Sequence, residues 1–340
     1  MIAKDALPMI QPRFDVLALG NAIVDVISPC KDKLLEAEDL PKGGMMLIDA
    51  DRATDLYSKM GPGQETSGGS AANTCAVMAA LGSRCAFVGQ VAEDQLGEVF
   101  AHDIRAAGIH FDVAPRIGQP PTARCLILVT PDGERTMNTF LGASQFLPEL
   151  ALDPDMIADS QVIYCEGYLW DPDEPRIAVQ RAIRLAKEAG REVAFTLSDA
   201  FLLERHGDDF RAMIADGKID ILFANEVEMM GLTGADTFDA GIDQLAAQVP
   251  VLVVTRSENG ATMVKDGERT EVPAEPVAMV VDTTGAGDAF AAGFLHGHVN
   301  GRDPKACLTM GAVAAAEVIS HYGARPEANL KKLLAKKGLG

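Results

Sequence analysis

A stretch near the C-terminal end of the chain brings two glycines and two carboxylates close together. It runs VDTTGAGDAF over residues 281–290, between an apolar run at 277–281, which predicts a buried strand, and a helical pattern at 289–299. Gly285 and Gly287 lack side chains, so backbone N–H groups can approach a ligand closely. These N–H groups lie at a predicted helix N-terminus, where the helix dipole favours an anion.

Asp288 brings a carboxylate to the same predicted anion site. A carboxylate there is unfavourable unless it has a chemical role. That role would be to take a proton from a hydroxyl group while the N–H groups hold the phosphoryl group that the hydroxyl attacks. The structural alternative is a glycine-rich turn with an aspartate in the first helical turn. Short glycine motifs are common, so the residues alone leave both interpretations open.

Two polar residues, Asn21 and Asp25, follow the apolar run at 14–20 that predicts the first central strand. Apolar and polar residues alternate from 21 to 25, so both side chains can share one face of a strand. Open α/β sheets bind ligands at the carboxyl ends of their strands, which favours a binding role. An edge hairpin with solvated polar side chains is equally consistent with the pattern.

A second glycine-to-helix segment, SGGSAAN, covers residues 67–73, and its helix runs to Leu81. Asn73 lies in the first turn of this helix. Gly68 and Gly69 together with Asn73 can surround a polar ligand, because the glycines allow close approach of the backbone. Close packing of small residues against a sheet is the structural alternative.

Asn225 and Glu228 follow a predicted strand at 219–224. Asn225 is well placed to cap the next helix, and Glu228, three residues later, completes an ordinary capping arrangement. The same pair can order water around Mg²⁺, which retains several waters and needs few carboxylates. From the residues alone, capping is the favoured interpretation.

A β-hairpin is predicted at 120–141, around a Pro-Asp-Gly turn at 131–133. It interrupts the alternation of helices and strands. We therefore assign it, with a predicted strand at 43–48, to a small β lid built from about 40–50 and 118–142.

The second strand of this hairpin carries two candidate ligand contacts. Phe140 shares a face with Asn138 and could cover a ring of the ligand, although a place in the lid core is at least as consistent. Arg135 is a candidate phosphate clamp, although isolated arginines more often lie at the surface.

Strands separated by helices, many of the strands fully apolar, predict a parallel sheet with helices on both faces. No linker divides the chain, so residues 1–340 are expected to form one α/β domain with the small β lid. The oligomeric state is left open between a monomer and a homodimer.

The composition narrows the class of partner. The chain has 340 residues, of which 48% are hydrophobic, and a net charge of −19. This charge disfavours nucleic acid and membrane surfaces as partners.

Residues 1–13 lack the apolar core of a signal peptide and predict a frayed leader. The six cysteines form no C-x-x-C pair; those at 75, 85, 125 and 165 lie in apolar segments, which predicts reduced thiols and a cytoplasmic location.

The segment DTTGAGDAFAAGF closely resembles the C-terminal signature of the ribokinase-like (PfkB) family of sugar and nucleoside kinases. GGSAAN at 68–73 and GQVAEDQLG at 89–97 resemble the N-terminal signature, and Asn225 with Glu228 resembles the family's N-x-x-E motif. Segments at 20–25, 135–143, 167–170 and 197–201 look like the adenosine kinase branch. The resemblance implies a ribokinase-like three-layer α/β/α sandwich with a central, mostly parallel sheet and a small β-sheet lid.

The resemblance also implies roles for individual residues. Asp288 resembles the catalytic base, and Gly285, Ala286 and Gly287 resemble the anion hole. Arg135 matches a lid arginine that reaches the phosphates. Substrate contacts carried over are Asn21, Asp25, Gly68, Gly69 and Asn73, with Asp25 accepting hydrogen bonds from the ribose 2′- and 3′-hydroxyls. Thr255, Ser257 and Gly260 resemble the loop that lines the ATP site. Asn225 and Glu228 resemble the group that orders the Mg²⁺ shell. The positions that bind a monovalent cation such as K⁺ are matched by Asp282, Thr284 and Gly323.

The activity implied by this resemblance is an ATP-dependent transfer to the 5′-hydroxyl of a nucleoside, with adenosine as the expected substrate. The alternative is a sugar kinase for ribose or fructose. Phe140 and the segment Tyr168-Leu169-Trp170 favour an apolar slot for a base, although the adenosine kinases carry a phenylalanine in the aligned segment, so which aromatic stacks on the base is open. A non-catalytic binding protein is disfavoured, because a binding protein gains nothing from Asp288.

Overall fold

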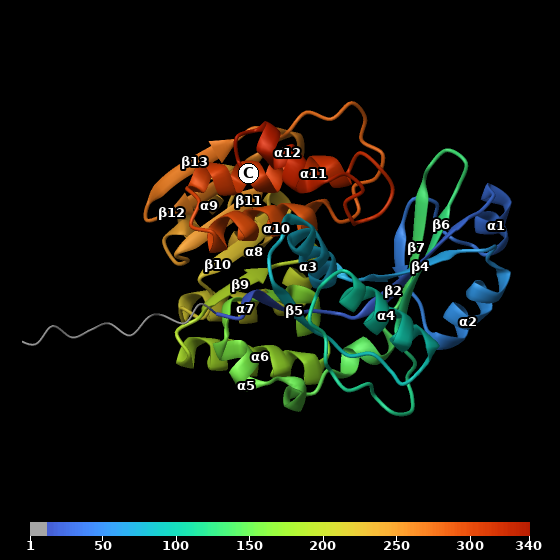
Figure 1. Ribbon diagram of the computed structural model, residues 1–340. Coiled ribbons are helices and arrows are strands. Elements are labelled where there is room, and N and C mark those ends of the chain that lie inside the picture. Colours follow the sequence, from blue (N-terminus) through green and yellow to red (C-terminus); the bar gives the residue numbers. More distant parts are fainter. Residues whose placement is uncertain (1–11) are drawn as a thin grey trace, which may run out of the picture.

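Two β-sheets organise the computed structural model, which describes residues 12–340; nearly all of the predicted leader lies outside these residues (Figure 1). In this described part, eight strands form the larger sheet. In spatial order they are β13 (Glu268–Val272), β12 (Ala261–Lys265), β11 (Val251–Thr255), β10 (Ile221–Asn225), β9 (Glu192–Thr196), β8 (Ser160–Glu166), β1 (Phe14–Leu19) and β5 (Cys85–Val88).

The larger sheet is mostly parallel. β1 pairs in parallel with β5 and β8, and parallel pairing continues through β9 and β10 to β11, whereas β12 and β13 are antiparallel. Side chains of the apolar strands alternate between two cores: Val16 and Ala18 pack into one, Leu17 and Leu19 into the other. The carboxyl ends of the parallel strands share one edge, which is where such sheets bind ligands.

Helices cover both faces of this sheet and complete three layers (Figure 1). The first core contains residues of α3 (Ser70–Leu81), α4 (Gln95–Ala106), α10 (Ala286–Val299), α11 (Pro304–Val318) and α12 (Leu330–Lys336). The second contains residues of α5 (Pro154–Ala158), α6 (Asp173–Glu188), α7 (Ala200–Ala215), α8 (Glu226–Thr233) and α9 (Phe238–Ala246). The predicted α/β sandwich with a mostly parallel sheet and a second, smaller sheet is confirmed.

The smaller sheet stands beside the three layers (Figure 1). Within the described residues its order is β3 (Met45–Leu47), β7 (Arg135–Phe140), β6 (Ala123–Val129), β2 (Ile23–Pro29) and β4 (Gln64–Gly68). β6 and β7 form the predicted hairpin, but β2 and β4 lie outside the ranges predicted for the lid. The sequence does not predict β4 because its residues, QETSG, are polar or small. Two helices, α1 (Asp32–Ala37) and α2 (Ala50–Lys59), accompany this sheet, and α2 packs against β6 and β7.

The apolar run at 277–281 is not a strand, and this prediction is wrong. Met279 is 67% exposed and Val280 is 54% exposed. The segment instead crosses the end of α11, where the backbone N–H of Val281 donates to the carbonyl of Ile319 at 2.8 Å. Met279 and Val280 are not buried against the larger sheet, so the apolar pattern of this segment does not produce a strand.

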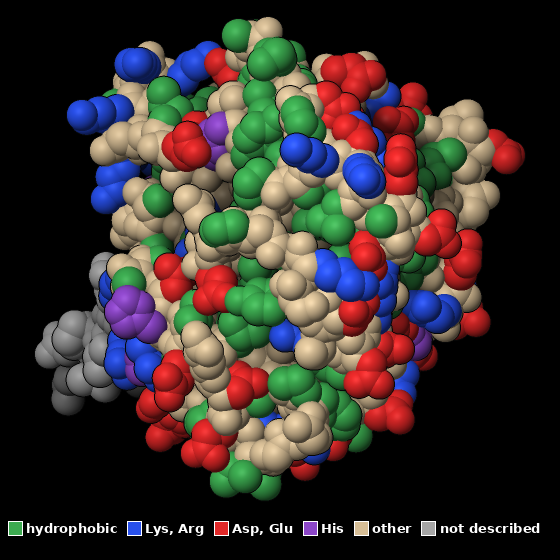
Figure 2. All heavy atoms as spheres, turned by 90° about the vertical axis from the view of Figure 1, so that its right-hand side faces the viewer, with side chains coloured by type: hydrophobic (Ala, Val, Ile, Leu, Met, Phe, Trp, Pro, Cys, Tyr) green, Lys and Arg blue, Asp and Glu red, His purple; other side chains and the backbone are tan. Residues whose placement is uncertain are grey.

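The surface and the thiols agree with the composition. Cys75, Cys85, Cys125 and Cys165 are buried and free, as the sequence predicts. Over residues 12–340, no helix combines the length and the hydropathy needed to cross a bilayer. Figure 2 shows acidic side chains spread over the face that carries the smaller sheet, with basic side chains between them.

Candidate active site

A cavity of about 390 Å³ lies between the carboxyl edge of the larger sheet and one face of the smaller sheet. Many of the predicted site residues line it, although they come from segments far apart in the sequence. They are Asp25, Gly69, Asn73, Tyr168, Asn225, Glu228, Thr255, Thr284, Gly285, Ala286, Gly287 and Asp288.

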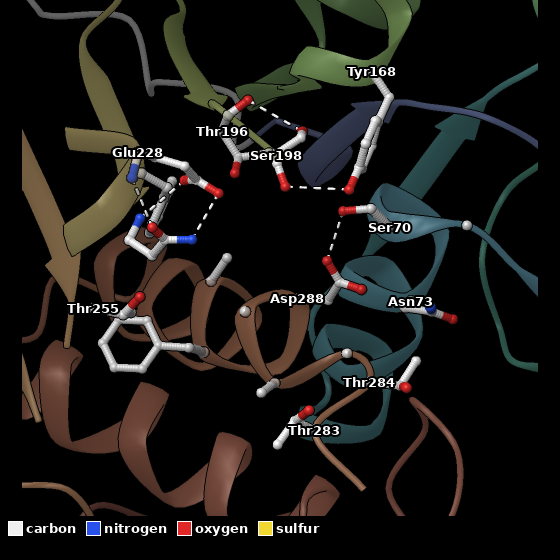
Figure 3. Close-up of a pocket in the computed structure, with 18 of the residues that line it drawn as sticks. Ser70, Asn73, Tyr168, Thr196, Ser198, Glu228, Thr255, Thr283, Thr284 and Asp288 are labelled. Carbon is white, nitrogen blue, oxygen red and sulfur yellow. Dashed lines mark hydrogen bonds between the residues drawn. The ribbon is translucent and has the colours of Figure 1, made fainter. Parts of the chain in front are cut away.

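Asp288 lies in the first turn of α10 and points into the cavity. The hydroxyl of Ser70, at the start of α3, donates to its Oδ1 at 2.6 Å, and Figure 3 shows the two side chains facing one another. Burial raises the pKa of Asp288 to about 6, and hydrogen bonds from Ser70 and Asn73 oppose that rise. A carboxylate with this pKa is ionised at neutral pH and is basic enough to accept a proton from a bound hydroxyl.

The N-terminus of α10 has the shape predicted for an anion site. Gly285 is its N-cap and has a φ of 76°, which a residue with a side chain rarely adopts. A Cβ at Gly285 would also lie 2.5 Å from the Cβ of Ala324, so the loop after α11 leaves room for glycine alone. The first N–H groups of a helix have no partner within it, and Gly285, Ala286 and Gly287 all line the cavity.

Asp25 lies on β2, on the opposite side of the cavity from the larger sheet. A Cβ on Gly68 would lie 2.3 Å from its Oδ2, so glycine at 68 makes room for this carboxylate. Burial raises the pKa of Asp25 to about 7; the charges of Arg325 and Arg135 lower it and that of Asp288 raises it. Within residues 12–340 the Asp25 carboxylate accepts no hydrogen bond, which leaves its oxygens for a ligand.

Asn21 does not line the cavity, contrary to prediction. Its backbone N–H and its Nδ2 both donate to Oε1 of Glu166 at 2.8 Å. The other oxygen of Glu166 accepts the backbone N–H of Ala71 at 2.8 Å. Glu166 is 1% exposed, and burial raises its pKa to about 7. This carboxylate, which the sequence analysis missed, ties the connection from β1 to β2 to the start of α3.

Asn225 and Glu228 form the capping box that the residues favoured. Oδ1 of Asn225 accepts the N–H of Glu228 at 2.8 Å, and the Glu228 carboxylate accepts the backbone N–H of Asn225 at 2.9 Å. Both also line the cavity, and burial raises the pKa of Glu228 to about 7. In the described chain no three His, Cys, Asp or Glu side chains cluster to bind a metal directly. Mg²⁺ bound through water needs few protein ligands, and this pair offers amide and carboxylate oxygens at the cavity wall.

The segment 167–170 divides between the cavity and the core. Tyr168 lines the cavity, and its hydroxyl donates to the carbonyl of Ser198 at 3.2 Å (Figure 3). Leu169 and Trp170 belong to the second core, and Trp170 Nε1 donates to Asp209 at 2.9 Å. The prediction that Leu169 and Trp170 contact the base is corrected: they face away from the cavity because the segment is a short 3₁₀ helix, whose side chains point in different directions.

Phe140 also lies outside the cavity lining. The side chains of β7 that reach the cavity are Met137 and Thr139, on the other face of the strand from Phe140. The sequence does not separate these faces, because five of the six residues of β7 are buried. The predicted stacking role of Phe140 is therefore corrected, and the small-sheet wall is formed instead by Ile23, Cys125, Met137 and Thr139 around Asp25.

Asp282, one of the residues predicted to bind a monovalent cation, forms an ion pair with Arg135. Nη1 of Arg135 lies 2.9 Å from Oδ2 of Asp282, and each side chain is 7% exposed. The Asp282 carboxylate also accepts the backbone N–H groups of Thr284 and Gly323, each at 3.0 Å. Its partners are all donors, so this set does not fit a monovalent cation. Arg135 does not itself line the cavity.

The predicted ATP loop follows β11. Thr255 lines the cavity at the end of that strand, whereas Ser257 and Gly260 do not. Gly260 has a φ of 86°, and a Cβ there would lie 2.0 Å from the carbonyl oxygen of Val272. Gly260 therefore shapes the turn into β12 rather than the cavity wall.

Several cavity residues escaped the sequence analysis. Ser70 lies inside the SGGSAAN segment and could have been found as a hydroxyl next to the two glycines. Thr196 ends the buried strand β9 and Ser198 follows it, the same kind of position that identified Asn225 at the end of β10 (Figure 3). Tyr164 and Phe223 lie inside apolar strands, and nothing in their sequence distinguishes them from core residues.

A carboxylate beside a glycine-flanked helix N-terminus, under a second sheet, puts a proton acceptor next to a place suited to an anion, which are the two features that phosphoryl transfer to a hydroxyl needs. The model of the pfkB family of carbohydrate kinases matches residues 37–331, and the chain belongs to this family. It is an ATP-dependent kinase that transfers a phosphoryl group to a hydroxyl group.

Three relatives illustrate the range of the family. The crystal structure of a probable sugar kinase from Rhizobium etli CFN 42 is 48% identical, with a TM-score of 0.90 over 97% of this chain and 100% of that chain. The adenosine kinase from Sinorhizobium meliloti is also 48% identical, with a TM-score of 0.88 over 96% of this chain and 99% of that one. A ribokinase from Arabidopsis thaliana is 30% identical over 96% of this chain and 83% of its own length.

Proposed function

We propose that this kinase phosphorylates the 5′-hydroxyl of a nucleoside, with adenosine as the substrate. The observation that carries the proposal is the wall around Asp25. Ile23, Cys125 and Met137 place an apolar surface next to a carboxylate that has no protein hydrogen-bond partner in residues 12–340. Such a wall suits a ribose that carries a flat apolar base, whereas a free sugar presents hydroxyls around its whole ring.

In the proposed reaction Asp25 accepts hydrogen bonds from the vicinal ribose hydroxyls, and Gly69 and Asn73 complete the grip. Asp288 takes the proton of the 5′-hydroxyl as its oxygen bonds to the γ-phosphorus of ATP. The bond from that phosphorus to the bridging oxygen breaks, and ADP leaves. The N–H groups at the start of α10 stabilise the charge on the transferred phosphoryl group.

The co-substrate ATP would extend from α10 toward Thr255. Asn225 and Glu228 would hold Mg²⁺ through water, and the ion would neutralise phosphate charge. In support of this role, the Glu228 carboxylate is held at the cavity wall by hydrogen bonds that it accepts from Nδ2 and the backbone N–H of Asn225, at 2.8 and 2.9 Å.

A sugar kinase is the second candidate. It is favoured by the corrected positions of Phe140 and Trp170, which remove two aromatic side chains from the expected base slot. The two candidates are separated by kcat/KM for adenosine, other nucleosides, ribose and fructose with ATP and Mg²⁺. The nucleoside proposal expects adenosine to exceed free ribose clearly, since stacking on a base contributes about 1–3 kcal/mol per ring. Equal or better phosphorylation of ribose or fructose overturns it in favour of the sugar kinase.

A further inference from the structure

Asp282 joins three segments that are distant in the sequence. Its Oδ1 accepts the N–H of Thr284, just before α10, and its Oδ2 accepts the N–H of Gly323, after α11. The same Oδ2 lies 2.9 Å from Nη1 of Arg135, which belongs to β7 of the smaller sheet. One carboxylate thus connects the smaller sheet to both loops that shape the N-terminus of α10.

The guanidinium of Arg135 is held from a second side as well. It lies 5.1 Å from the centroid of the Tyr322 ring, a distance at which a cation interacts with an aromatic face. With the side chain 7% exposed, the positive charge is shielded from water. A buried cation enclosed by a carboxylate and an aromatic ring is a fixed part of the structure, unlike an arginine at the surface.

This arrangement leaves no role for a dissolved cation at the same carboxylate. Asp282 is already neutralised by a guanidinium, and its remaining partners are N–H groups rather than oxygen ligands. A second cation within ion-pair distance of Asp282 would be repelled by Arg135, and repulsion is strong where water is excluded.

We propose that Arg135 is a built-in cation: its guanidinium takes the place of a monovalent ion on Asp282, and the pair positions the loops that form the anion site of α10. Asp282 and Arg135 are then positioning residues, and the enzyme needs no K⁺ or Na⁺. The pair also fastens the smaller sheet over the cavity. This inference rests on the proposed phosphoryl transfer but not on the choice between nucleoside and sugar.

The test compares KCl with tetramethylammonium chloride at equal ionic strength, measuring both Tm and kcat/KM with whichever substrate the wild-type enzyme phosphorylates. The wild type should give the same values in both salts. Arg135→Met should lower both in tetramethylammonium and regain Tm and activity in KCl, because K⁺ can now reach Asp282. The gain in kcat/KM should be roughly 5- to 150-fold, the usual range when two binding events are coupled.

Three further variants control this result. Arg135→Lys keeps a positive charge and should not respond to K⁺. Arg135→Met combined with Asp282→Asn should lose the response, because the carboxylate is gone. Arg124→Met removes another arginine of the smaller sheet, one that hydrogen-bonds to Thr54, and should respond to neither salt. Wild-type activation by K⁺, or an Arg135→Met variant with equal Tm in both salts, overturns the proposal. The Tm comparison needs no substrate, so it decides the inference even if the enzyme's substrate is neither nucleoside nor sugar.

Discussion

Two carboxylates face one another across the cavity, and they are held in different ways. Asp288, in helix α10, accepts a 2.6 Å hydrogen bond from the Ser70 hydroxyl. Asp25, on β2 of the smaller sheet, accepts none from residues 12–340. Both line the cavity and are partly exposed, and loss of surrounding water raises the pKa of each.

The difference is that a protein hydrogen bond orients Asp288 before any ligand binds, whereas none orients Asp25. The protein already orients Asp288, as a base must be oriented before it can accept a proton in the transition state. Asp25 has no hydrogen-bond partner in residues 12–340, although the charges of Arg325 and Arg135 partly offset its desolvation. A polar group left unpaired in a closed site costs about 1–3 kcal/mol. The hydroxyls of a substrate would remove that cost by hydrogen-bonding to Asp25. The smaller sheet therefore contributes mainly to substrate binding, and α10, which carries Asp288, to the chemical step.

Removing the base should produce the largest effect. Asp288→Asn keeps the shape of the side chain and removes the proton acceptor, so kcat should fall by about 10²–10⁴. ATP affinity, measured by calorimetry, should change little. Ser70→Ala is the matched control: it leaves the base in place but removes one of the hydrogen bonds that lower its pKa, so its loss should be smaller and should shrink at high pH. Near wild-type turnover of Asp288→Asn would exclude Asp288 from the mechanism.

Removing the Asp25 carboxylate should change the selectivity between ribonucleosides and 2′-deoxynucleosides rather than the chemical step. In the wild type, a 2′-deoxynucleoside lacks one hydroxyl and leaves Asp25 with one hydrogen bond fewer, which costs about 1–3 kcal/mol. Because about 1.4 kcal/mol corresponds to a factor of ten, its kcat/KM should be at least ~10-fold lower than that of the ribonucleoside. Asp25→Ala should nearly abolish this preference, since both substrates then lose the same partner. The ratio of the two substrates within one variant is its own control for damage to the fold. A preference that survives the substitution would place the hydroxyl contact elsewhere.

The pH dependence should report both carboxylates. Each must be ionised to act, so log kcat/KM should rise with pH through the window set by pKa values of about 6 for Asp288 and about 7 for Asp25. At low pH the rise in Asp25→Asn should involve one proton fewer than the rise in the wild type.

The stability of the fold should move in the opposite direction over the same window. The pKa values of these two carboxyl groups are about 7 and about 6 in the folded chain, whereas the ordinary aspartate pKa, which applies to the unfolded chain, is 3.8. Fewer protons are then bound in the unfolded state, so the free energy of unfolding should fall as pH rises from about 4 to 7. Urea unfolding of wild type and Asp25→Asn across this range measures it, and a wild-type slope equal to that of the variant contradicts the raised pKa of Asp25.

The smallest effect should come from a third buried carboxylate, Glu228, which is oriented like Asp288 but by a capping box. Glu228→Gln should raise the Mg²⁺ concentration for half-maximal activity and leave nucleoside affinity largely intact. Glu226→Gln is the matched control, because it removes the same charge from the same helical turn but at a more exposed position. If Glu228→Gln lowers Tm alone, capping is its whole role.

The sequence predicts the larger sheet and helix α10, which carries Asp288, better than it predicts the smaller sheet, which carries Asp25. Strands β8 to β11 are apolar because both of their faces are buried, and glycines at 285 and 287 mark the start of α10. The smaller sheet is harder because β7 is buried on both faces, so the alternation that would assign Met137 and Phe140 to opposite faces is hidden. Partners distant in the sequence, such as Glu166 for Asn21 or Arg135 for Asp282, are fixed by the packing of whole elements.

The path of the chain between the two sheets has a consequence for how the protein folds. The chain leaves the larger sheet after β1, forms β2 and β4, returns for β5, and leaves again for β6 and β7 before β8 closes the other side of β1. The smaller sheet is complete at β7, when only β1 and β5 of the larger sheet have been synthesised, and the larger sheet is completed long afterwards. Both sheets therefore depend on contacts between distant segments, which slows folding. A nascent chain that ends before residue 123 presents β2 with an unpaired edge, the kind of edge that aggregates. We expect truncations between β4 and β6 to need a chaperone to stay in solution.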